Sequence, residues 1–76
     1  MEMTEKLVRE FDAKDEDGNL YAILEYQQYA SFEPINQPIQ YLKGRKRFTL
    51  GDGSPVQDRD DGTLIIVESG TIVREV

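Results

Sequence analysis

The sequence predicts a small all-β domain: an antiparallel meander of five or six strands, with a strongly twisted sheet or a partly closed barrel. Two observations support this. Turn-forming residues cluster at positions 15–19, 51–55, 60–62 and 69–70. Gly, Asn and Asp reverse the chain at low cost, because Gly and Asn tolerate positive φ and Asp caps turn backbones. The segments between these clusters are short and rich in Val, Ile, Leu, Thr, Tyr and Phe, a composition typical of strands.

The length and composition allow one domain, spanning residues 1–76. Folding at this size hides only about 60% of the surface of the unfolded chain, so we expect a thin core. Apolar residues make up 38% of the chain and charged residues 32%, which is the balance of a globular rather than a disordered protein.

The N-terminal third predicts a β-hairpin. Residues 6–13 form its first strand, residues 15–19 its turn and residues 20–29 its second strand. A helix over residues 4–11 is the alternative, because Thr4 could cap it and apolar side chains recur there at helical spacing. We choose the strand because the turn at residues 15–19 would then connect two paired strands of a hairpin.

Residues 30–40 form the one long connection. Pro34 and Pro38 lack the backbone N–H group that a helix or a central strand requires. We therefore expect an ordered loop that crosses the sheet. Its apolar side chains are expected to pack onto the core: Phe32, Ile35 and Ile39.

The C-terminal half predicts two further strands and a hairpin. Residues 41–50 and 55–58 form the third and fourth strands, and residues 63–68 and 71–76 form the hairpin. With a two-residue loop at residues 69–70, this hairpin pairs in a defined register. The expected opposite pairs are Val67 with Ile72, Ile66 with Val73, Ile65 with Arg74 and Leu64 with Glu75.

The four consecutive aliphatic residues 64–67 are the main functional clue. Successive side chains of a strand point to opposite faces, so this segment needs cover on both sides. Burying each side chain contributes about 1.5–3 kcal/mol. Either the sheet curls over itself, with the loop of residues 30–40 covering one face, or a second copy or another protein supplies the cover. The expected interface residues are Ile65, Val67, Ile72 and Val76, with Tyr26 and Tyr29 as secondary candidates.

Four basic residues lie within five positions of an otherwise acidic chain: Lys43, Arg45, Lys46 and Arg47. On a regular strand, Lys46 would point to the face opposite the other three. One interpretation is an anion- or nucleic-acid-binding strip with Tyr41 available to stack on a base. The other is an edge strand whose charges block unwanted pairing. The net charge of −6 favours the second interpretation, because the whole chain repels phosphate.

Two acidic clusters raise the question of a metal site. Residues 15–19 begin like a calcium loop, but such a loop needs Gly at its sixth position and Glu at its twelfth, where this chain has Leu20 and Tyr26. Asp58, Asp60 and Asp61 could hold Mg²⁺, yet they also form an ordinary turn sequence. We favour solvated turns at both places, and we predict no metal and no cofactor.

Several function classes are excluded by composition. The chain has neither Cys nor His, so disulfides, thiolate nucleophiles, cysteine-bound zinc and Ser–His catalysis are not available. The N-terminus has no apolar run resembling a signal peptide, and residues 64–67 are far too few to span a bilayer. We expect a cytoplasmic protein that is not an enzyme and does not bind membranes, and its negative charge disfavours nucleic acid as a partner.

Most of the chain outside the proline-containing loop resembles a family of short, uncharacterised bacterial proteins. The similarity lies in residues 11–21, in residues 44–50 and in the turn-rich stretch from Asp52 to Gly70. Members of this family begin with a D-x-x-G hairpin and end with a D-G-x-x-V segment followed by an I-V-x-(T/S)-G hairpin. The resemblance implies a small β domain without an assigned activity, and it transfers no functional residues.

Taken together, the sequence predicts a non-enzymatic protein-interaction or assembly module. Its partner is another protein or a second copy of the chain, a homodimer being the simplest form. The alternative is an accessory protein that associates with anions or nucleic acid through the four basic residues. A carboxylate-based enzyme ranks third.

Overall fold

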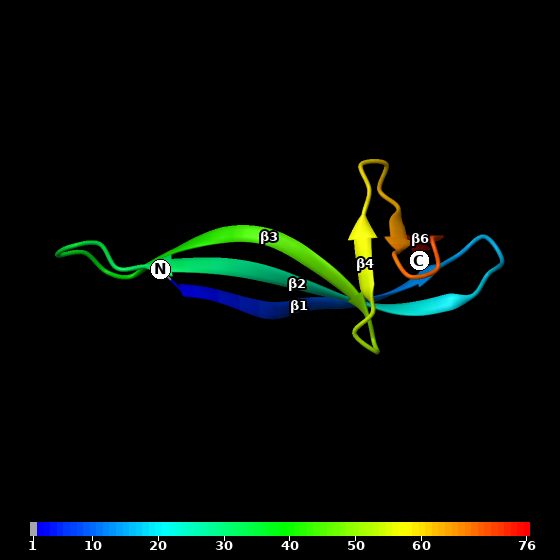
Figure 1. Ribbon diagram of the computed structural model, residues 1–76, viewed down its shortest axis with the longest axis horizontal. Coiled ribbons are helices and arrows are strands. Elements are labelled where there is room, and N and C mark those ends of the chain that lie inside the picture. Colours follow the sequence, from blue (N-terminus) through cyan, green and yellow to red (C-terminus); the bar gives the residue numbers. More distant parts are fainter. Residues whose placement is uncertain (1) are drawn as a thin grey trace.

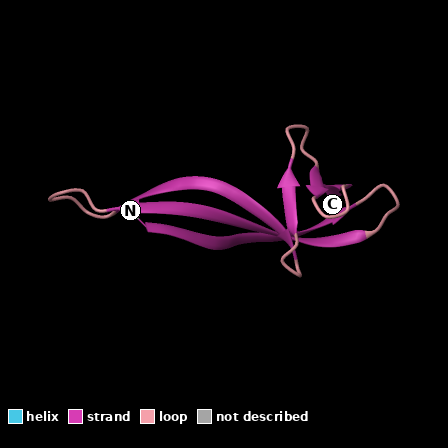
Figure 2. Cartoon of the chain, viewed as in Figure 1, coloured by secondary structure: helices cyan, strands magenta, loops and turns pink. Residues whose placement is uncertain are grey.

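The computed structural model describes residues 2–76, and every regular element within them is a β-strand. The six strands are β1 (Glu2–Lys14), β2 (Leu20–Phe32), β3 (Gln40–Leu50), β4 (Pro55–Asp58), β5 (Leu64–Ile66) and β6 (Thr71–Glu75) (Figures 1 and 2). Each strand pairs antiparallel with the next, and β6 pairs with β1, so the sheet closes into a small barrel. The predicted all-β meander is confirmed, and its sheet is a closed barrel.

Only one end of the three long strands belongs to the barrel. β1 meets β6 at Ala13 and Lys14, and β3 meets β4 at Phe48 and Thr49. Beyond these positions β1, β2 and β3 continue as a three-stranded sheet that extends away from β4, β5 and β6 (Figure 1). We call residues 2–8 and 26–47 the arm. The whole molecule measures 56 × 24 × 21 Å.

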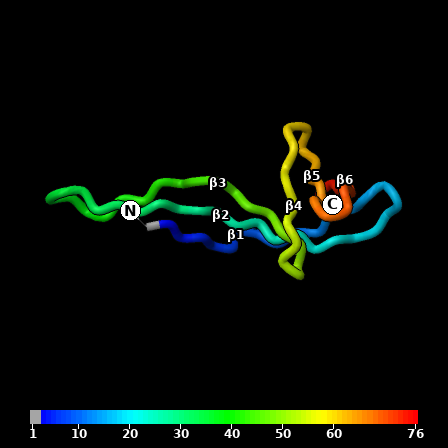
Figure 3. Tube along the Cα trace, in the orientation of Figure 1, coloured from blue at the N-terminus to red at the C-terminus, as the bar shows by residue number. Residues whose placement is uncertain are grey.

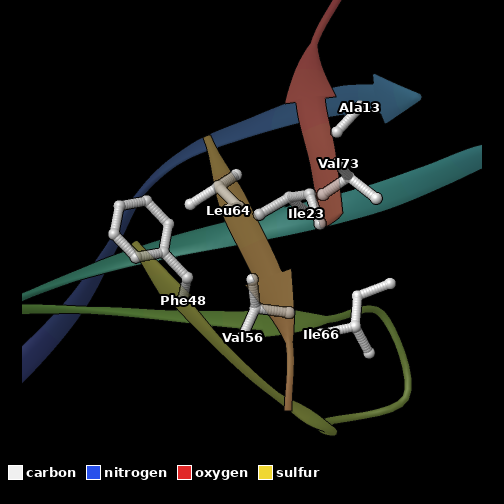
Figure 4. Packing of buried hydrophobic residues seen from close by; sticks show 7 residues of the cluster. All are labelled: Ala13, Ile23, Phe48, Val56, Leu64, Ile66 and Val73. Atoms are coloured by element: carbon white, nitrogen blue, oxygen red, sulfur yellow. The ribbon is translucent and has the colours of Figure 1, made fainter. Parts of the chain in front are cut away.

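Seven buried side chains fill the barrel, and every strand contributes at least one (Figure 4). They are Ala13, Ile23, Phe48, Val56, Leu64, Ile66 and Val73. The ring of Phe11 meets that of Phe48 edge to face, with 6.5 Å between the ring centroids. Ile23 and Val73 are completely buried, so the small core has its centre where β2 passes β6.

Two β-bulges lie in the arm. In the first, Val8 of β1 is an extra residue with no partner on β2. In the second, Gly44 and Arg45 of β3 lie opposite the single residue Gln28 of β2. A Cβ atom on Gly44 would lie 3.4 Å from the carbonyl oxygen of Gln28, so the absence of a side chain allows the two strands their close approach there. Bulges of this kind bend a strand and increase its twist.

The predicted first hairpin and its turn are confirmed. The carboxylate of Asp15 accepts hydrogen bonds from the backbone N–H groups of Asp17 and Asn19, and Gly18 has a φ of 84°, a conformation that only glycine adopts easily. β1 spans Glu2–Lys14, so the predicted strand over residues 6–13 is confirmed and the alternative helix over residues 4–11 is wrong.

Two expectations about the loops are wrong. Residues 33–39 connect β2 to β3 at the far end of the arm, and Ile35 and Ile39 are 89% and 51% exposed. The reason is the length of β2 and β3, which pair over nine positions and place their connection far from the core. Residues 30–40 therefore neither cross the sheet nor pack onto the barrel.

The last hairpin has a different register from the predicted one. Ile65 lies opposite Ile72, and Leu64 lies opposite Val73. The turn uses four residues, 67–70, and closes with a hydrogen bond from the N–H group of Gly70 to the carbonyl oxygen of Ile66. Because the shift is two residues, the division of side chains between the two faces remains as predicted.

Candidate interaction surfaces

The predicted interface residues of the last hairpin share the outside of the barrel. Leu64, Ile66 and Val73 point inward and are buried. The opposite face carries what we call the apolar strip: Ile65, Val67, Ile72 and Val76. In this strip Ile65 is half-buried, whereas Val67, Ile72 and Val76 are 53%, 38% and 74% exposed. The barrel therefore covers one face of the aliphatic segment and leaves the other largely open.

The face of the arm that continues the inside of the barrel is rich in lysine and tyrosine. Reading outward along the register, Gln27 lies between Lys6 and Lys46, and then Tyr29 lies between Thr4 and Lys43. Tyr41 follows on β3, opposite Ser31. We call this surface the inner face of the arm and define it by Thr4, Lys6, Gln27, Tyr29, Tyr41, Lys43 and Lys46.

A shallow hollow occupies the middle of the inner face. Thr4, Lys6, Tyr29 and Tyr41 line its volume of about 460 Å³. The Nζ atom of Lys6 lies 5.9 Å from the centroid of the Tyr29 ring, and Tyr41 is 68% exposed. The ammonium group of Lys6 gives this hollow a positive charge, which attracts negatively charged groups.

The opposite, outer face of the arm is partly apolar. The guanidinium of Arg47 binds the carboxylate of Glu5 at 2.6 and 2.9 Å and stacks over Tyr26 at 4.7 Å. The hydrogen bond from Arg47 lowers the pKa of Glu5 below its ordinary value. Exposed apolar side chains lie beside this pair: Met3, Leu7 and Leu42.

The predicted arrangement of the four basic residues is wrong. The bulge around Gly44 changes the alternation of β3, so that Lys43 and Lys46 share the inner face while Arg47 points to the outer face. Arg45 lies in the bulge itself and is exposed. The two secondary interface candidates also separate, because Tyr26 lies on the outer face of the arm and Tyr29 on the inner face.

A buried carboxylate joins the arm to the barrel. The side chain of Glu25 is 9% exposed and lies 3.2 Å from Arg9 and 3.6 Å from Lys46. Arg9 also binds Glu75 of β6 at 2.9 Å, and the hydrogen bond to Glu75 is the main cause of the raised pKa of Arg9. Sequence reasoning missed both Glu25 and Lys6; the apolar neighbours of Glu25 on β2 were the available signal for a buried carboxylate.

The acidic turns lie at the barrel end of the molecule. Asp15 binds Asn19 and Tyr21, and Asp61 binds Thr63, so these carboxylates cap their own turns. The same hydrogen bonds lower the pKa of both carboxyl groups, that of Asp15 chiefly through the Asn19 side chain. Within residues 2–76, no group of three or more acidic side chains is placed to hold a metal ion.

A second hollow lies between the β1–β2 turn and the β5–β6 turn. Both turns belong to the barrel end of the molecule (Figure 3). Its volume is about 350 Å³. Asp15, Glu16 and Asp17 supply a negative wall, and Ile72 of the apolar strip supplies an apolar side chain. We call it the acidic hollow. Its charge is opposite in sign to that of the inner face of the arm, which carries lysines.

Comparisons with protein-family models, with curated proteins and with solved structures gave no match to this chain. The resemblance to short bacterial proteins therefore stays a prediction. Across the part of the chain that the structure describes, no helix is long and apolar enough to cross a membrane.

Proposed function

We propose that this chain is a non-enzymatic protein-interaction or assembly module. One observation carries the proposal. The arm is a single layer of three strands, and residues 40–47 of β3 are exposed along their whole length. Domains are usually built from two packed layers, because a sheet must bury at least one face against something. Apart from the buried Gln27 near the barrel, neither face of the arm is covered by a second layer, and a protein partner would supply that layer.

The apolar strip supports the same proposal. Ile65, Val67, Ile72 and Val76 lie on the outside of the barrel, where no other element of residues 2–76 covers them fully. Exposed apolar side chains grouped on one face are typical of interaction sites, although Arg74 lies between Ile72 and Val76 on this face. We further propose self-association, with a homodimer as its simplest form, in the bacterial cytoplasm.

The test is the mass of the protein in solution, compared between wild type and Val67→Asp. Val67 is 53% exposed and lies in a turn, so an aspartate there leaves the barrel intact. We expect a wild-type dimer at micromolar concentration and a dissociation constant at least about tenfold weaker in the variant, which corresponds to about 1.4 kcal/mol. Arg59→Glu, in the turn between β4 and β5 and outside both the arm and the apolar strip, is the control and should behave as wild type. A wild type that stays monomeric would contradict self-association.

A second candidate is association with anions or nucleic acid through Lys43, Arg45, Lys46 and Arg47. The observation in its favour is the placing of Lys43 and Lys46 on one face with Tyr29 and Tyr41, since cations interleaved with aromatic rings suit single strands. Titration with a fluorescent oligothymidine at several salt concentrations tests it. Affinity that falls steeply with salt favours this candidate, and no binding at low salt rejects it.

A further inference from the structure

The charge of the molecule is divided unevenly along its length. The arm carries five Lys or Arg residues against three Glu residues, a net charge of +2. The barrel, residues 9–25 and 48–76, carries four against twelve, a net charge of −8. The chain as a whole is acidic, so a positive arm is a local feature that the overall charge conceals.

The two complementary surfaces lie far apart. The inner face presents Lys6 and Lys43 beside Tyr29 and Tyr41, and the acidic hollow presents Glu16 and Asp17 beside Ile72. The tip of the arm and the β1–β2 turn lie at opposite ends of the long axis (Figure 1), which measures 56 Å. One molecule therefore cannot bring its own arm onto its own acidic hollow.

We propose that the inner face of the arm docks on the acidic hollow of a second copy, and that the second copy returns the same contact. This inference rests on the proposed function and names its partner and its two surfaces. Lysine ammonium groups of one copy meet the carboxylates of Glu16 and Asp17 of the other, and the tyrosine rings pack toward Ile72. Antiparallel pairing uses both contacts at once and closes the assembly as a two-fold dimer.

The charge pattern favours a second copy over a nucleic acid. A strand of phosphates on the inner face would also meet the field of a barrel with a net charge of −8, and long-range repulsion lowers such binding. A second copy turns the same barrel charge into attraction, because each arm lies against the acidic end of its partner. The apolar contacts then add to a charge-guided encounter.

Paired charge reversal tests the proposal. Lys6→Glu with Lys43→Glu makes the arm acidic, and Glu16→Lys with Asp17→Lys makes the hollow basic. We expect each double variant alone to be monomeric at concentrations where the wild type is a dimer. We expect an equimolar mixture of the two to give the mass of a dimer, because one contact is then wild type and the other has its charges exchanged. Light scattering after gel filtration measures these masses at low salt.

The control and the contrary outcomes separate this inference from the proposed function. Arg59→Glu adds negative charge outside both surfaces and should leave the dimer unchanged. A wild-type dimer that both double variants retain, and that Val67→Asp dissociates, would overturn the inference and leave the proposed function standing. A mixture that stays monomeric would also overturn it. A monomeric wild type would overturn both, and oligothymidine binding lost in the arm variant would assign the inner face to nucleic acid.

Discussion

Substituting threonine at each of two neighbouring positions of β6, Ile72 and Val73, tests which of the two side chains points into the barrel. Val73 is completely buried and Ile72 is 38% exposed. Val73→Thr replaces a buried methyl group with a hydroxyl, which loses about 0.8 kcal/mol of apolar burial and adds about 1–3 kcal/mol for an unpaired buried hydroxyl. We expect a total cost of about 2–4 kcal/mol. Ile72→Thr leaves its hydroxyl in water and should cost below about 1 kcal/mol.

These costs are large for a chain of this size. A stability of about 0.05–0.15 kcal/mol per residue gives about 4–11 kcal/mol for the whole protein, so Val73→Thr removes a large part of it. The melting temperature should fall by about 8–32 °C for Val73→Thr, at about 4–8 °C per kcal/mol. Urea and thermal unfolding, both in dilute protein at high salt, exclude a contribution from self-association.

One result would refute the assignment of the two faces of β6. A one-residue slip of β6 would exchange its two faces, placing Ile72 inside the barrel and Val73 outside. If Ile72→Thr proved as costly as Val73→Thr, or more costly, the assignment of the two faces would be wrong. The apolar strip, and the interaction surface built on it, would then lose their basis.

Three further predictions concern the barrel. Glu25→Ala should cost about 1–2 kcal/mol in urea unfolding, because it leaves Arg9 without its buried partner; the cost is reduced by the 48% exposure of the Arg9 side chain. Thr49→Val should raise the free energy of unfolding by about 1 kcal/mol in the same assay, because the buried Oγ1 atom of Thr49 has no hydrogen-bond partner. The pKa values of Asp15 and Asp61 are lowered in the folded state. The stability that these carboxylates contribute is therefore present above about pH 4 and is lost as the pH falls through their folded-state pKa values. Urea unfolding at a series of acidic pH values should show the free energy of unfolding decreasing over this range.

The sequence predicted the elements of the fold well, for local reasons. The turn at residues 15–19 depends on Gly18, whose positive φ suits glycine, and on Asp15, whose side chain caps the same turn. Information of this kind lies within five residues. The strand of residues 55–58 and the outer face of the last hairpin were also predictable, because alternation of side chains requires only that the segment be extended.

The arm was not predictable, because its cause is not local. Nothing in the composition of β2 distinguishes the part inside the barrel from the part beyond it, since Ile23 and Tyr29 both suit a strand. The division arises where β4 and β6 stop pairing with β3 and β1, and this depends on residues up to 62 positions away in the sequence, as in the pair of Ala13 and Glu75. The bulge around Gly44 had a local signal in the glycine itself, yet a glycine in a strand also occurs at tight bends and at close backbone contacts, so it did not specify a bulge.

The stability of the arm and the assembly of the protein are coupled. An isolated sheet of three strands is close to the smallest that is stable in water, and it needs a hydrophobic face to be so. The inner face of this arm carries lysines rather than aliphatic side chains. On its outer face Arg47 and Glu5 form an exposed ion pair, and exposed ion pairs stabilise a fold only weakly. The core of the barrel lies beyond the end of the arm and cannot stabilise its tip. Docking of a second copy would add the missing layer. The same contacts would then both order the arm and hold the two copies together.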